Sequence, residues 1–379
     1  MDFSFTEEQE ELRTTARAFL AEHSGSEAVR AAMESELGYD PGLWKQLGAE
    51  LGWTAVTIPE DCGGLGLSYV ELVALLEIMG EHLLCSPFFA SLCLGANTIL
   101  TAGSESQRQE LLPGIAEGDV RATLAATEGV GRWDVDSIET TAERKGDDYV
   151  LRGAKRFVVD GHCADLIVVA ARAPGSVGDE GLSLFAVPAD APGLVRTPLP
   201  GMDRTRRLAA LGLHEVRVPA ATRLGDEGAA APALQQTLDL ACIGLAAEQV
   251  GGAQRCLDLS VEHAKERVQF GRPIGSFQAV KHLCADMMVA VETARSAVYY
   301  AGCVAAESSD ELGLVAPLAK AWCSDAFFRC AGDAIQVHGG VGFTWEYDVH
   351  LYFKRARAGA SLLGQPSFHR ERVARGIGL

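Results

Sequence analysis

The residues best suited to hold a nucleotide lie in a short break between two long helical patterns. Apolar residues recur at helical spacing over residues 234–267 and again over 277–306, and the break at 267–278 reads R-V-Q-F-G-R-P-I-G-S-F-Q. A guanidinium group such as that of Arg267 suits a diphosphate, and an aromatic face such as that of Phe270 suits a purine ring. We therefore expect a nucleotide-bearing cofactor to lie across this break.

The same break has a simpler interpretation, which is a well-made stop between two helices. Gly271 and Pro273 end the first helix, and Ser276 stands where it can cap the second. A helical stop needs only glycine and proline, however, and it does not need the arginine, glutamine and aromatic side chains that crowd this one. The choice of residues therefore favours a cofactor site over a bare turn.

A second glycine-rich stretch, Q-V-H-G-G-V-G-F-T-W-E at residues 336–346, follows a third helical pattern. Glycines let a backbone approach a ligand closely, but the spacing matches neither the G-x-G-x-x-G nor the P-loop fingerprint. Together the two stretches resemble the acyl-CoA dehydrogenase family of flavoproteins, in the runs R-x-Q-F-G-x-P-I-x-x-F-Q and Q-x-H-G-G-x-G-F. The resemblance implies FAD as the cofactor, and it implies that these stretches bind it through Arg267, Gln269, Phe270, Gln278, Gln336, Gly339 and Gly340.

Two loops of a β-rich middle region extend the resemblance. A-T-E-G-V-G-R-W-D at residues 126–134 is similar to the family's T-E-P-x-A-G-S-D, with Trp133 where a substrate-contacting serine usually stands. G-A-K-R-F-V-V at residues 153–159 resembles G-x-K-x-W-I-T, in which the aromatic residue and those after it flank the flavin. On its own, each loop is better explained as a plain hairpin. In register with the helical motifs, the loops are expected to contact the cofactor through Thr127, Phe157 and the backbone N–H of Val159.

The chemistry that the resemblance implies is dehydrogenation of an acyl-CoA thioester, which needs a base for the α proton and donors to the thioester oxygen. Family members place the base at one of two positions, and in this chain those positions carry Ala241 and Leu363. Neither side chain takes up a proton, although the backbone N–H of Leu363 remains available to the thioester oxygen. The implied substrate contacts are Trp133, Asp239, Leu363 and Gly364.

Several interpretations follow from the missing base. The chain is expected to be the base-lacking subunit of a heteromeric, sterol-CoA type dehydrogenase, whose Leu-Leu-Gly-x-Pro ending it resembles, paired with a related chain that carries the glutamate. Alternatively, the enzyme is self-sufficient and its base has moved to Glu248, roughly 10 Å along the helix from Ala241 on nearly the same face, with Asp239 a weaker choice. The simpler explanation of Glu248 is a buried carboxylate paired with an arginine. A flavin-free acyl-CoA-binding partner, or a flavin monooxygenase or oxidase on the same scaffold, would need no base either.

Four small residues of the same helix bear on the size of the acyl group, and they are Ala246, Ala247, Gly251 and Gly252. They leave room for a bulky group if nothing fills the space beside them. Close packing of a neighbouring helix explains them more simply, because glycine and alanine let two backbones approach.

The elements that must position these residues change character twice along the chain. Residues 1–120 are helical in pattern and begin with a capping box formed by Thr6 and Gln9. Short β-rich runs between glycine and aspartate turns then indicate a small barrel or sandwich domain over 121–228; the runs cover residues 149–152, 156–159, 166–170, 184–187 and 216–219. The rest, 229–379, reads as helices at 234–267, 277–306, 312–335 and 345 onward. The expected fold is α+β, with an N-terminal helical domain, a middle β domain and a C-terminal four-helix bundle, as in the acyl-CoA dehydrogenase family.

Composition excludes some classes of partner. Lysine and arginine number 33 against 51 acidic residues, a net charge of −18, so no basic excess exists to neutralise a nucleic acid or an anionic membrane. No apolar run approaches the roughly 18 residues of a membrane span, the acidic N-terminus lacks the regions of a signal peptide, and the 10 cysteines show no metal-ligand spacing. We therefore expect a cytoplasmic protein that binds no metal. The implied partners are an acyl-CoA substrate, an electron-transferring flavoprotein and a homo- or hetero-oligomer with a related chain.

Overall fold

The structure is a computed structural model that describes residues 6–379, and its contacts divide the chain into two compact units. The first, here called the helical unit, comprises residues 6–31, 69–84 and 242–379. The second, here called the sheet unit, comprises residues 32–68 and 85–241. Each unit combines segments that lie far apart in the sequence. The division into domains 1–120, 121–228 and 229–379 stays a prediction.

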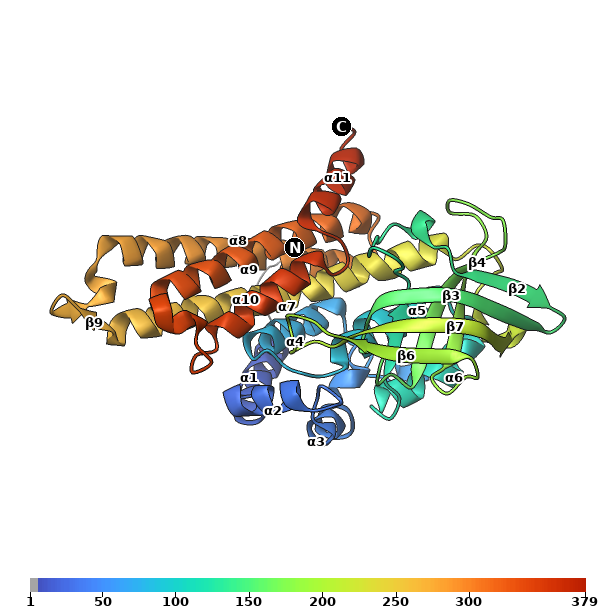
Figure 1. The fold of residues 1–379 in the computed structure, drawn as a ribbon, viewed down its shortest axis with the longest axis horizontal. Helices are drawn as coiled ribbons and strands as arrows, with labels where there is room; N and C mark the ends of the chain where they lie inside the picture. Colours follow the sequence, from blue (N-terminus) through green and yellow to red (C-terminus); the bar gives the residue numbers. More distant parts are fainter. Residues whose placement is uncertain (1–5) are drawn as a thin grey trace. The chain divides into compact units, whose positions relative to one another are not determined.

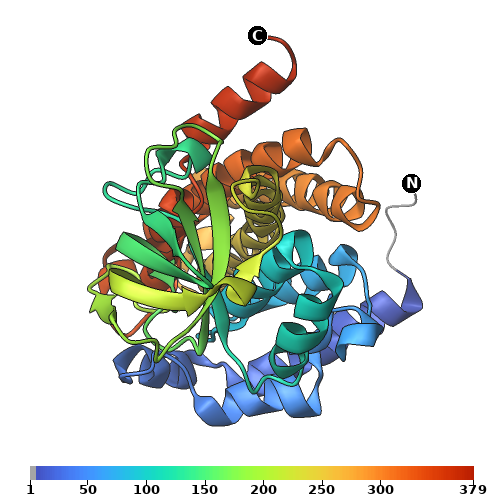
Figure 2. The same cartoon turned by 90° about the vertical axis from the view of Figure 1, so that its right-hand side faces the viewer.

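The sheet unit is built around an eight-stranded β-sheet with the strand order β6-β7-β3-β2-β4-β5-β8, in which β1 lies beside β4. The strands are β1 Ala122–Ala125, β2 Thr141–Lys145, β3 Asp148–Val159, β4 Leu166–Arg172, β5 Leu182–Pro188, β6 Leu194–Leu199, β7 Leu208–Pro219 and β8 Arg223–Leu224. β1 runs parallel to β4, and β3 pairs antiparallel with both β2 and β7. Figure 2 shows these strands side by side and twisted as a group.

The expected β runs all lie in strands, but two of them merge. Residues 149–152 and 156–159 belong to the single strand β3, whose pairing with β7 shifts register between Lys155 and Val158. Such an irregularity bends a strand and re-aims its side chains. The strands β1, β2 and β6 were not expected, because β1 is short and because β2 and β6 carry polar residues at many of their positions.

The core of the sheet unit follows from the alternation of its strands. Inward-facing residues of different strands, among them Leu151, Ile167 and Leu211, are almost completely buried. The rings of Tyr149 and Phe185 meet in this core with their centroids 4.9 Å apart. The helices of the sheet unit are α3 Pro41–Lys45, the π-helical segment Phe89–Ala96, α5 Asn97–Ala102 and α6 Glu105–Ala116.

The helical unit contains long helices that lie side by side in Figure 1. Its helices are α1 Glu7–His23, α2 Ser26–Glu34, α4 Tyr69–Glu81, α7 Ala231–Glu266, α8 Gln278–Ala306, α9 Leu312–His338, α10 Val349–Ser361 and α11 Pro366–Gly376, of which α2 and α7 extend into the sheet unit. The capping box at the start of α1 is confirmed, because Gln9 N donates to Thr6 Oγ1 at 3.2 Å and Thr6 N donates to Gln9 Oε1 at 3.0 Å.

Two expectations for the C-terminal helices were wrong. Ser276 does not cap α8: the residue at the N-cap is Phe277, and no side chain makes a capping hydrogen bond there. The single helix expected from residue 345 onward is two helices, α10 and α11, separated by a turn at Leu362–Gln365. The chain breaks there because Leu363 and Gly364 have φ values of 60° and 104°, which cannot continue a right-handed helix.

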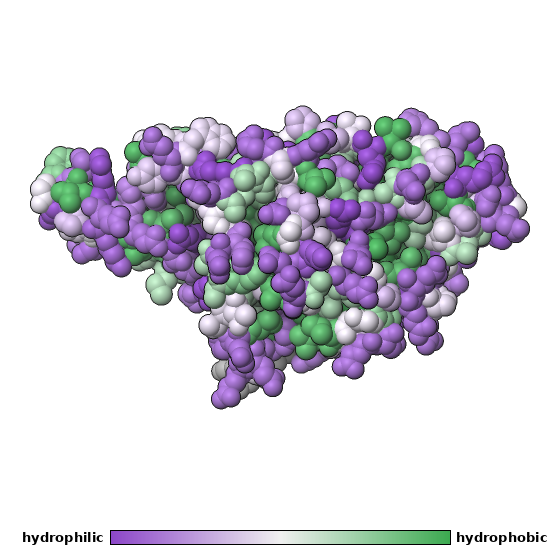
Figure 3. All heavy atoms as spheres, turned by 90° about the horizontal axis from the view of Figure 1, so that it is seen from below, coloured by the Kyte–Doolittle hydropathy of each residue, from purple (hydrophilic) through white to green (hydrophobic). Residues whose placement is uncertain are grey.

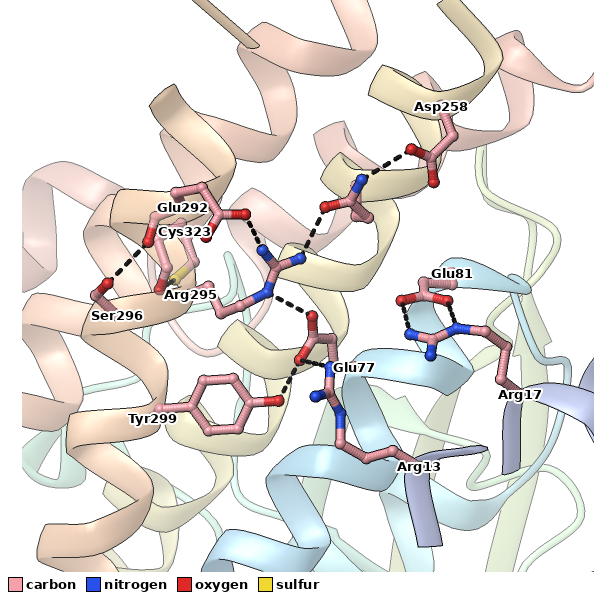
Figure 4. Close-up of polar contacts among 12 residues, drawn as sticks. Arg13, Arg17, Glu77, Glu81, Asp258, Glu292, Arg295, Ser296, Tyr299 and Cys323 are labelled. Carbon is pink, nitrogen blue, oxygen red and sulfur yellow. Dashed lines mark hydrogen bonds and ion pairs between the residues drawn. The ribbon is translucent and has the colours of Figure 1, made fainter. Parts of the chain in front are cut away.

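A buried carboxylate ties four helices of the helical unit together (Figure 4). Glu77 of α4 is completely buried and accepts a hydrogen bond from Arg295 Nε of α8 at 2.9 Å, and the hydroxyl of Tyr299 also donates to it. Arg13 Nη2 of α1 lies 4.0 Å from the same carboxylate, and Arg295 Nη2 donates to Gln254 Oε1 of α7 at 2.8 Å. A charge this deep requires paired cations and donors to offset its desolvation.

The small residues of α7 serve close packing. A Cβ on Gly251 would lie 1.7 Å from the backbone oxygen of Glu77, and a Cβ on Gly80 of α4 would lie 2.1 Å from that of Glu248. A Cβ on Gly252 would overlap an aromatic ring at 2.4 Å. The backbones of α4 and α7 therefore touch, and these glycines do not leave room for a bulky acyl group.

The surface is predominantly polar on the face drawn in Figure 3, where apolar residues form separate patches. Over residues 6–379, no helix combines the length and the apolar character that a membrane span requires.

Candidate functional site

The first predicted cofactor stretch forms a small hairpin at the end of α7. The strands β9 Val268–Gln269 and β10 Arg272–Pro273 pair antiparallel, and Figure 1 places them at the tip of the helical unit, between α7 and α8. Phe270 stands at the hairpin turn with a positive φ of 52° and is 92% exposed. Arg267, Gln269 and Gln278 are also exposed.

The second predicted stretch follows α9, which runs three residues further than expected and ends at His338. Gln336 is exposed on the last turn of this helix, and Gly339 leaves it with a positive φ of 65°. Gly339 and Gly340 then open a short 3-10 segment, Gly339–Phe343.

The structure brings the two stretches together through a pair of histidines. His263, on the last turn of α7, stacks on His338 with ring centroids 4.3 Å apart, and Tyr347 meets both rings edge-on. The Nδ1 of His338 lies 2.8 Å from Ala334 O. Burial lowers the pKa of both imidazoles from the usual value, and the mutual proximity of the rings lowers that of His263 further. Two neutral rings can stack without repulsion, so the ends of α7 and α9 are held at one place.

Both stretches fit a ligand that approaches from outside the chain. A Cβ built on Gly271, Gly339 or Gly340 would meet no atom within 4 Å, so open space lies beside these backbones. The exposed arginine, glutamines and aromatic ring supply a cation, amide donors and a stacking face in the same region. Phe270 also holds a positive φ, a conformation that costs a non-glycine residue free energy and often marks a ligand contact.

In the sheet unit, a buried ion pair fastens the two predicted loops to one another. Lys155 of β3 is fully buried, and its Nζ lies 2.5 Å from Glu128 Oε1 and 3.2 Å from Ala126 O. Glu128 also accepts the backbone N–H of Thr140 at 3.0 Å. Burial lowers the pKa of Lys155 to about 8. Burial opposes the charge of Glu128 too, but Lys155 and the hydrogen bonds from Thr140 outweigh it and keep the pKa of this carboxyl below its usual value.

The predicted flavin contacts of the sheet unit lie beside this ion pair. Thr127 Oγ1 donates to Arg156 O at 2.6 Å, and Arg156 N donates to Thr127 O at 2.9 Å, so the two loops run together. Phe157 is half-buried and has a positive φ of 56° at the irregularity of β3, and a Cβ on Gly131 would lie 3.0 Å from its ring. Val159 is buried, and its carbonyl accepts a hydrogen bond from the Thr123 hydroxyl at 2.7 Å.

The predicted substrate residue Trp133 lines a pocket of the sheet unit. Thr127 is brought to the same pocket, together with Leu234 and Leu238 from the first turns of α7. Asp239 directly follows Leu238 but is 3% exposed, and its carboxylate accepts a hydrogen bond from Gln235 Nε2 of the same helix at 3.2 Å. The structure therefore unites Trp133 with Thr127, whereas Asp239 is not among the residues that line this pocket.

The two positions where a base was sought are buried and apolar. Ala241 is 0% exposed within α7, and Leu363 is 2% exposed at the turn between α10 and α11. Gly364 follows with a φ of 104°, and a Cβ on it would lie 2.6 Å from the ring of Phe368. Neither the side chain of Ala241 nor that of Leu363 can accept a proton.

Glu248, the candidate for a relocated base, is 7% exposed and faces Arg355 of α10, whose Nη2 lies 3.6 Å from Glu248 Oε2. Both side chains line a small pocket of the helical unit with Gln249 and Phe327. Two buried side chains of opposite charge at this distance form a structural ion pair.

Comparison with known proteins decides the family. The chain matches the N-terminal, middle and C-terminal domains of acyl-CoA dehydrogenase over residues 6–119, 123–216 and 231–378. It is also 38% identical to the acyl-CoA dehydrogenase IpdE2 of Mycolicibacterium smegmatis over 95% of this chain and 96% of that protein. The chain belongs to the acyl-CoA dehydrogenase family.

Solved structures agree with this family and with its expected α+β fold. The chain is similar to a protein of the ChsE4–ChsE5 complex from Mycobacterium tuberculosis, with a TM-score of 0.90 and 29% identity over 100% of this chain and 99% of the other. It is also similar to a chain of the Tcur3481–Tcur3483 steroid ACAD, with a TM-score of 0.87 and 35% identity over 98% of each chain. The protein is thus an acyl-CoA dehydrogenase, an oxidoreductase that acts on a CH–CH group. Members of the acyl-CoA dehydrogenase family bind FAD.

Sequence reasoning missed several residues that shape the candidate site. Lys155 and Glu128 were matched to family motifs but given no role, because Lys155 fell between two predicted β runs and its burial follows only from their merging into β3. The stacked His263 and the edge-on Tyr347 carried no local signal, because only the fold brings them to His338.

Within residues 6–379, one cluster of possible metal ligands occurs, in the sheet unit. The ligand atoms of Asp160, His162 and Cys163 lie within 4.8 Å of one another. Burial raises the pKa of the Cys163 thiol well above its usual value, and the thiol donates to Asp160 O at 3.4 Å. Nearby arginines lower the pKa of His162 further than burial alone, so the local field disfavours a cation.

Proposed function

We propose that this chain is the base-lacking subunit of a heteromeric acyl-CoA dehydrogenase that acts on a bulky, sterol-type CoA ester. The observation that carries the proposal is the pair of buried apolar residues, Ala241 and Leu363, at both positions where the family places its base. The Glu248–Arg355 ion pair supports it, because the carboxylate nearest in sequence to Ala241 on the same face is already engaged.

The comparisons favour the same proposal. Two of the similar structures are two-chain assemblies, the ChsE4–ChsE5 complex and the Tcur3481–Tcur3483 steroid ACAD. A related chain with a glutamate at one of the two positions would supply the proton acceptor that this chain lacks. The sterol-type substrate rests on these relatives and not on the small residues of α7, which serve packing.

The cofactor of the proposal is FAD, which when bound accepts the β hydrogen of the thioester as a hydride. In the helical unit, Arg267 and Phe270 would hold the diphosphate and the adenine of a cofactor bound across a subunit contact, and the open backbones of Gly339 and Gly340 would lie against it. In the sheet unit, Thr127, Phe157 and Val159 would contact the flavin. The chain's contribution to the thioester is the N–H of Leu363, which would orient the carbonyl oxygen and stabilise the charge that develops there. An electron-transferring flavoprotein is the proposed acceptor of the electrons.

Placing a base into the chain tests the proposal. We expect the flavin of the isolated, FAD-loaded chain to be reduced slowly under anaerobic conditions, seen as slow bleaching of its absorbance. The CoA thioesters tested range from butyryl-CoA to a sterol side-chain CoA ester. Leu363→Glu or Ala241→Glu should accelerate bleaching by about a hundredfold or more, the contribution of a positioned general base. The matched variants Leu363→Gln and Ala241→Gln add the same volume without a base and should stay slow.

Other outcomes would replace the proposal. Fast bleaching by the unaltered chain, abolished by Glu248→Gln, would show a self-sufficient enzyme with a relocated base. Rapid reoxidation of the reduced flavin by oxygen would show an oxidase or monooxygenase. A chain that binds no FAD after refolding with it would be a flavin-free partner. Isolation of the natural assembly would support the proposal only if its second chain is a family member with glutamate at one of the two positions.

A further inference from the structure

A completely buried lysine lies beneath the turn between α10 and α11. Lys320 of α9 is 0% exposed, and its Nζ lies 2.9 Å from Ser324 Oγ on the same helix. The same ammonium lies 3.2 Å from Gly359 O, near the end of α10, and 3.3 Å from Gly364 O, beyond the turn. One cation therefore binds the backbone on both sides of Leu363.

The turn itself holds a costly conformation. Leu363 has a positive φ of 60° although it is neither glycine nor asparagine, and such strain persists only where the surroundings determine it. The carbonyl of Leu363 is held from the other side, because it lies 2.8 Å from Nε2 of the buried His369. Among the residues that the structure describes, the N–H of Leu363 has no hydrogen-bond acceptor.

The carbonyls around Leu363 are thus engaged by the protein while its N–H is left free. A buried N–H without an acceptor is rare in a folded protein, and it costs free energy unless a ligand atom accepts its hydrogen bond. The clamp on the flanking carbonyls keeps the peptide from rotating to bury that N–H against another group.

We propose that Lys320 is a positioning residue, which holds the turn so that the N–H of Leu363 meets the carbonyl oxygen of the acyl-CoA thioester. The inference rests on the proposed function, since it takes the thioester oxygen as the ligand of that N–H. Hydrogen bonds from an ammonium to carbonyls are stronger than neutral ones, which suits a residue that must hold a strained turn. Burial lowers the pKa of Lys320 to about 8, which leaves the ammonium mostly protonated at neutral pH.

A purely structural role is the alternative, in which Lys320 only satisfies the last carbonyls of α10. The two roles differ in what they predict for the ligand. A structural lysine would affect all CoA ligands alike, whereas a positioning lysine would affect only those with a carbonyl oxygen at the thioester position.

The experiment compares octanoyl-CoA with S-octyl-CoA, the thioether that lacks the carbonyl oxygen. Affinities are measured by titration calorimetry on the FAD-loaded protein and on Lys320→Met, which keeps the length and the apolar stem. We expect the unaltered protein to prefer the thioester about fivefold, the effect of one neutral hydrogen bond. Lys320→Met should bind both ligands about equally, with its FAD content and its affinity for S-octyl-CoA unchanged.

Each other result has a definite meaning. A Lys320→Met protein that keeps the full preference for the thioester overturns the inference. If the unaltered protein shows no preference, the role of Leu363 in the proposed function fails instead, and the base-insertion experiment then decides the remainder of that function separately. Lys320→Gln keeps an N–H donor and serves if the methionine variant does not fold: about a twofold preference supports the inference, and an undiminished one overturns it.

Discussion

Lys155 and Glu128 show how a single charged pair can decide the shape of a loop. Each group alone would be strongly disfavoured where it lies, and together they join the loop after β1 to the middle of β3. Because Arg156 and Thr127 exchange hydrogen bonds beside this pair, the pair also sets where the predicted flavin contacts lie. The ion pair therefore positions the candidate site although it need not touch a ligand.

Replacing Glu128 with glutamine should destabilise the protein by about 3 kcal/mol at pH 7, because it leaves a buried ammonium without its counter-charge. The folded pKa of Glu128 lies below its unfolded value of about 4.3. Its stabilisation is therefore fully present above that value and is lost as the pH falls through the folded pKa. Urea denaturation at several pH values should show the difference between the two proteins shrinking below pH ~4.

A matched control is Glu143→Gln, which removes a carboxylate from a half-exposed pair with Arg152 at 2.9 Å. Exposed pairs contribute little because solvent screens them, so this variant should be almost as stable as the unaltered protein. Equal losses of stability in the Glu128 and Glu143 variants would contradict the role assigned to burial.

At the scale of elements, the hairpin between α7 and α8 presents its side chains outward. Arg267 and Arg272 both belong to it, but the guanidinium of Arg272 lies over the ring of Phe277, 4.1 Å from its centroid. The two arginines of one short hairpin can therefore be compared directly.

Arg267→Ala should weaken FAD binding by about 2–4 kcal/mol if this guanidinium pairs with the cofactor's diphosphate. Arg272→Ala removes a charge of the same sign from the same hairpin and should weaken binding far less. Fluorescence titration of the FAD-free protein measures both. Equal effects would mean that the hairpin attracts the cofactor only through its overall charge.

Helices could be predicted from the sequence with good accuracy, because a 3.6-residue apolar period is a local signal. The predicted start and end of α8 differ from the structure by at most one residue, and the capping box of α1 was visible in two side chains. The left-handed conformation of Leu363 was not predicted, since it depends on partners such as Lys320 and His369 that only the fold brings to the turn. The strand β6 was missed because its polar positions hide the alternation.

The candidate site was predicted unevenly for the same physical reason. Motif residues such as Arg267 and Thr127 could be named from runs of neighbours in the sequence. The residues that hold those motifs in place, Lys155 with Glu128 and His263 with His338, are pairs whose partners become neighbours only after folding. Their assignments in the functional site stay proposals, whereas their contacts are properties of the fold.

At the scale of the molecule, the N-terminal helices α1 and α4 belong by their contacts to the same unit as the C-terminal helices. Glu77 links these helices electrostatically, because cations from α1 and α8 lie beside this one buried carboxylate. The N-terminal helices thus contribute to the packing of the C-terminal helices.

Glu77→Gln should therefore destabilise the helical unit by about 3–5 kcal/mol, because Arg295 loses its buried counter-charge. Glu292→Gln is the control, since Glu292 pairs with the same arginine but its side chain is 55% exposed. That variant should lower the free energy of unfolding by about 1 kcal/mol or less. Thermal and urea unfolding measure both, and a Glu77→Gln protein as stable as the control would refute the central place given to this carboxylate.

The touching backbones of α4 and α7 also limit how the enzyme could be redesigned. At Gly80 and Gly251 there is no side chain between the helices, so no substitution along that contact can create space by trimming. Adding even a methyl group would force the two helices apart and disturb the carboxylates carried on either side. An engineer who wishes to widen the range of acyl groups must therefore look to other walls of the protein, or must unwind one of these helices altogether.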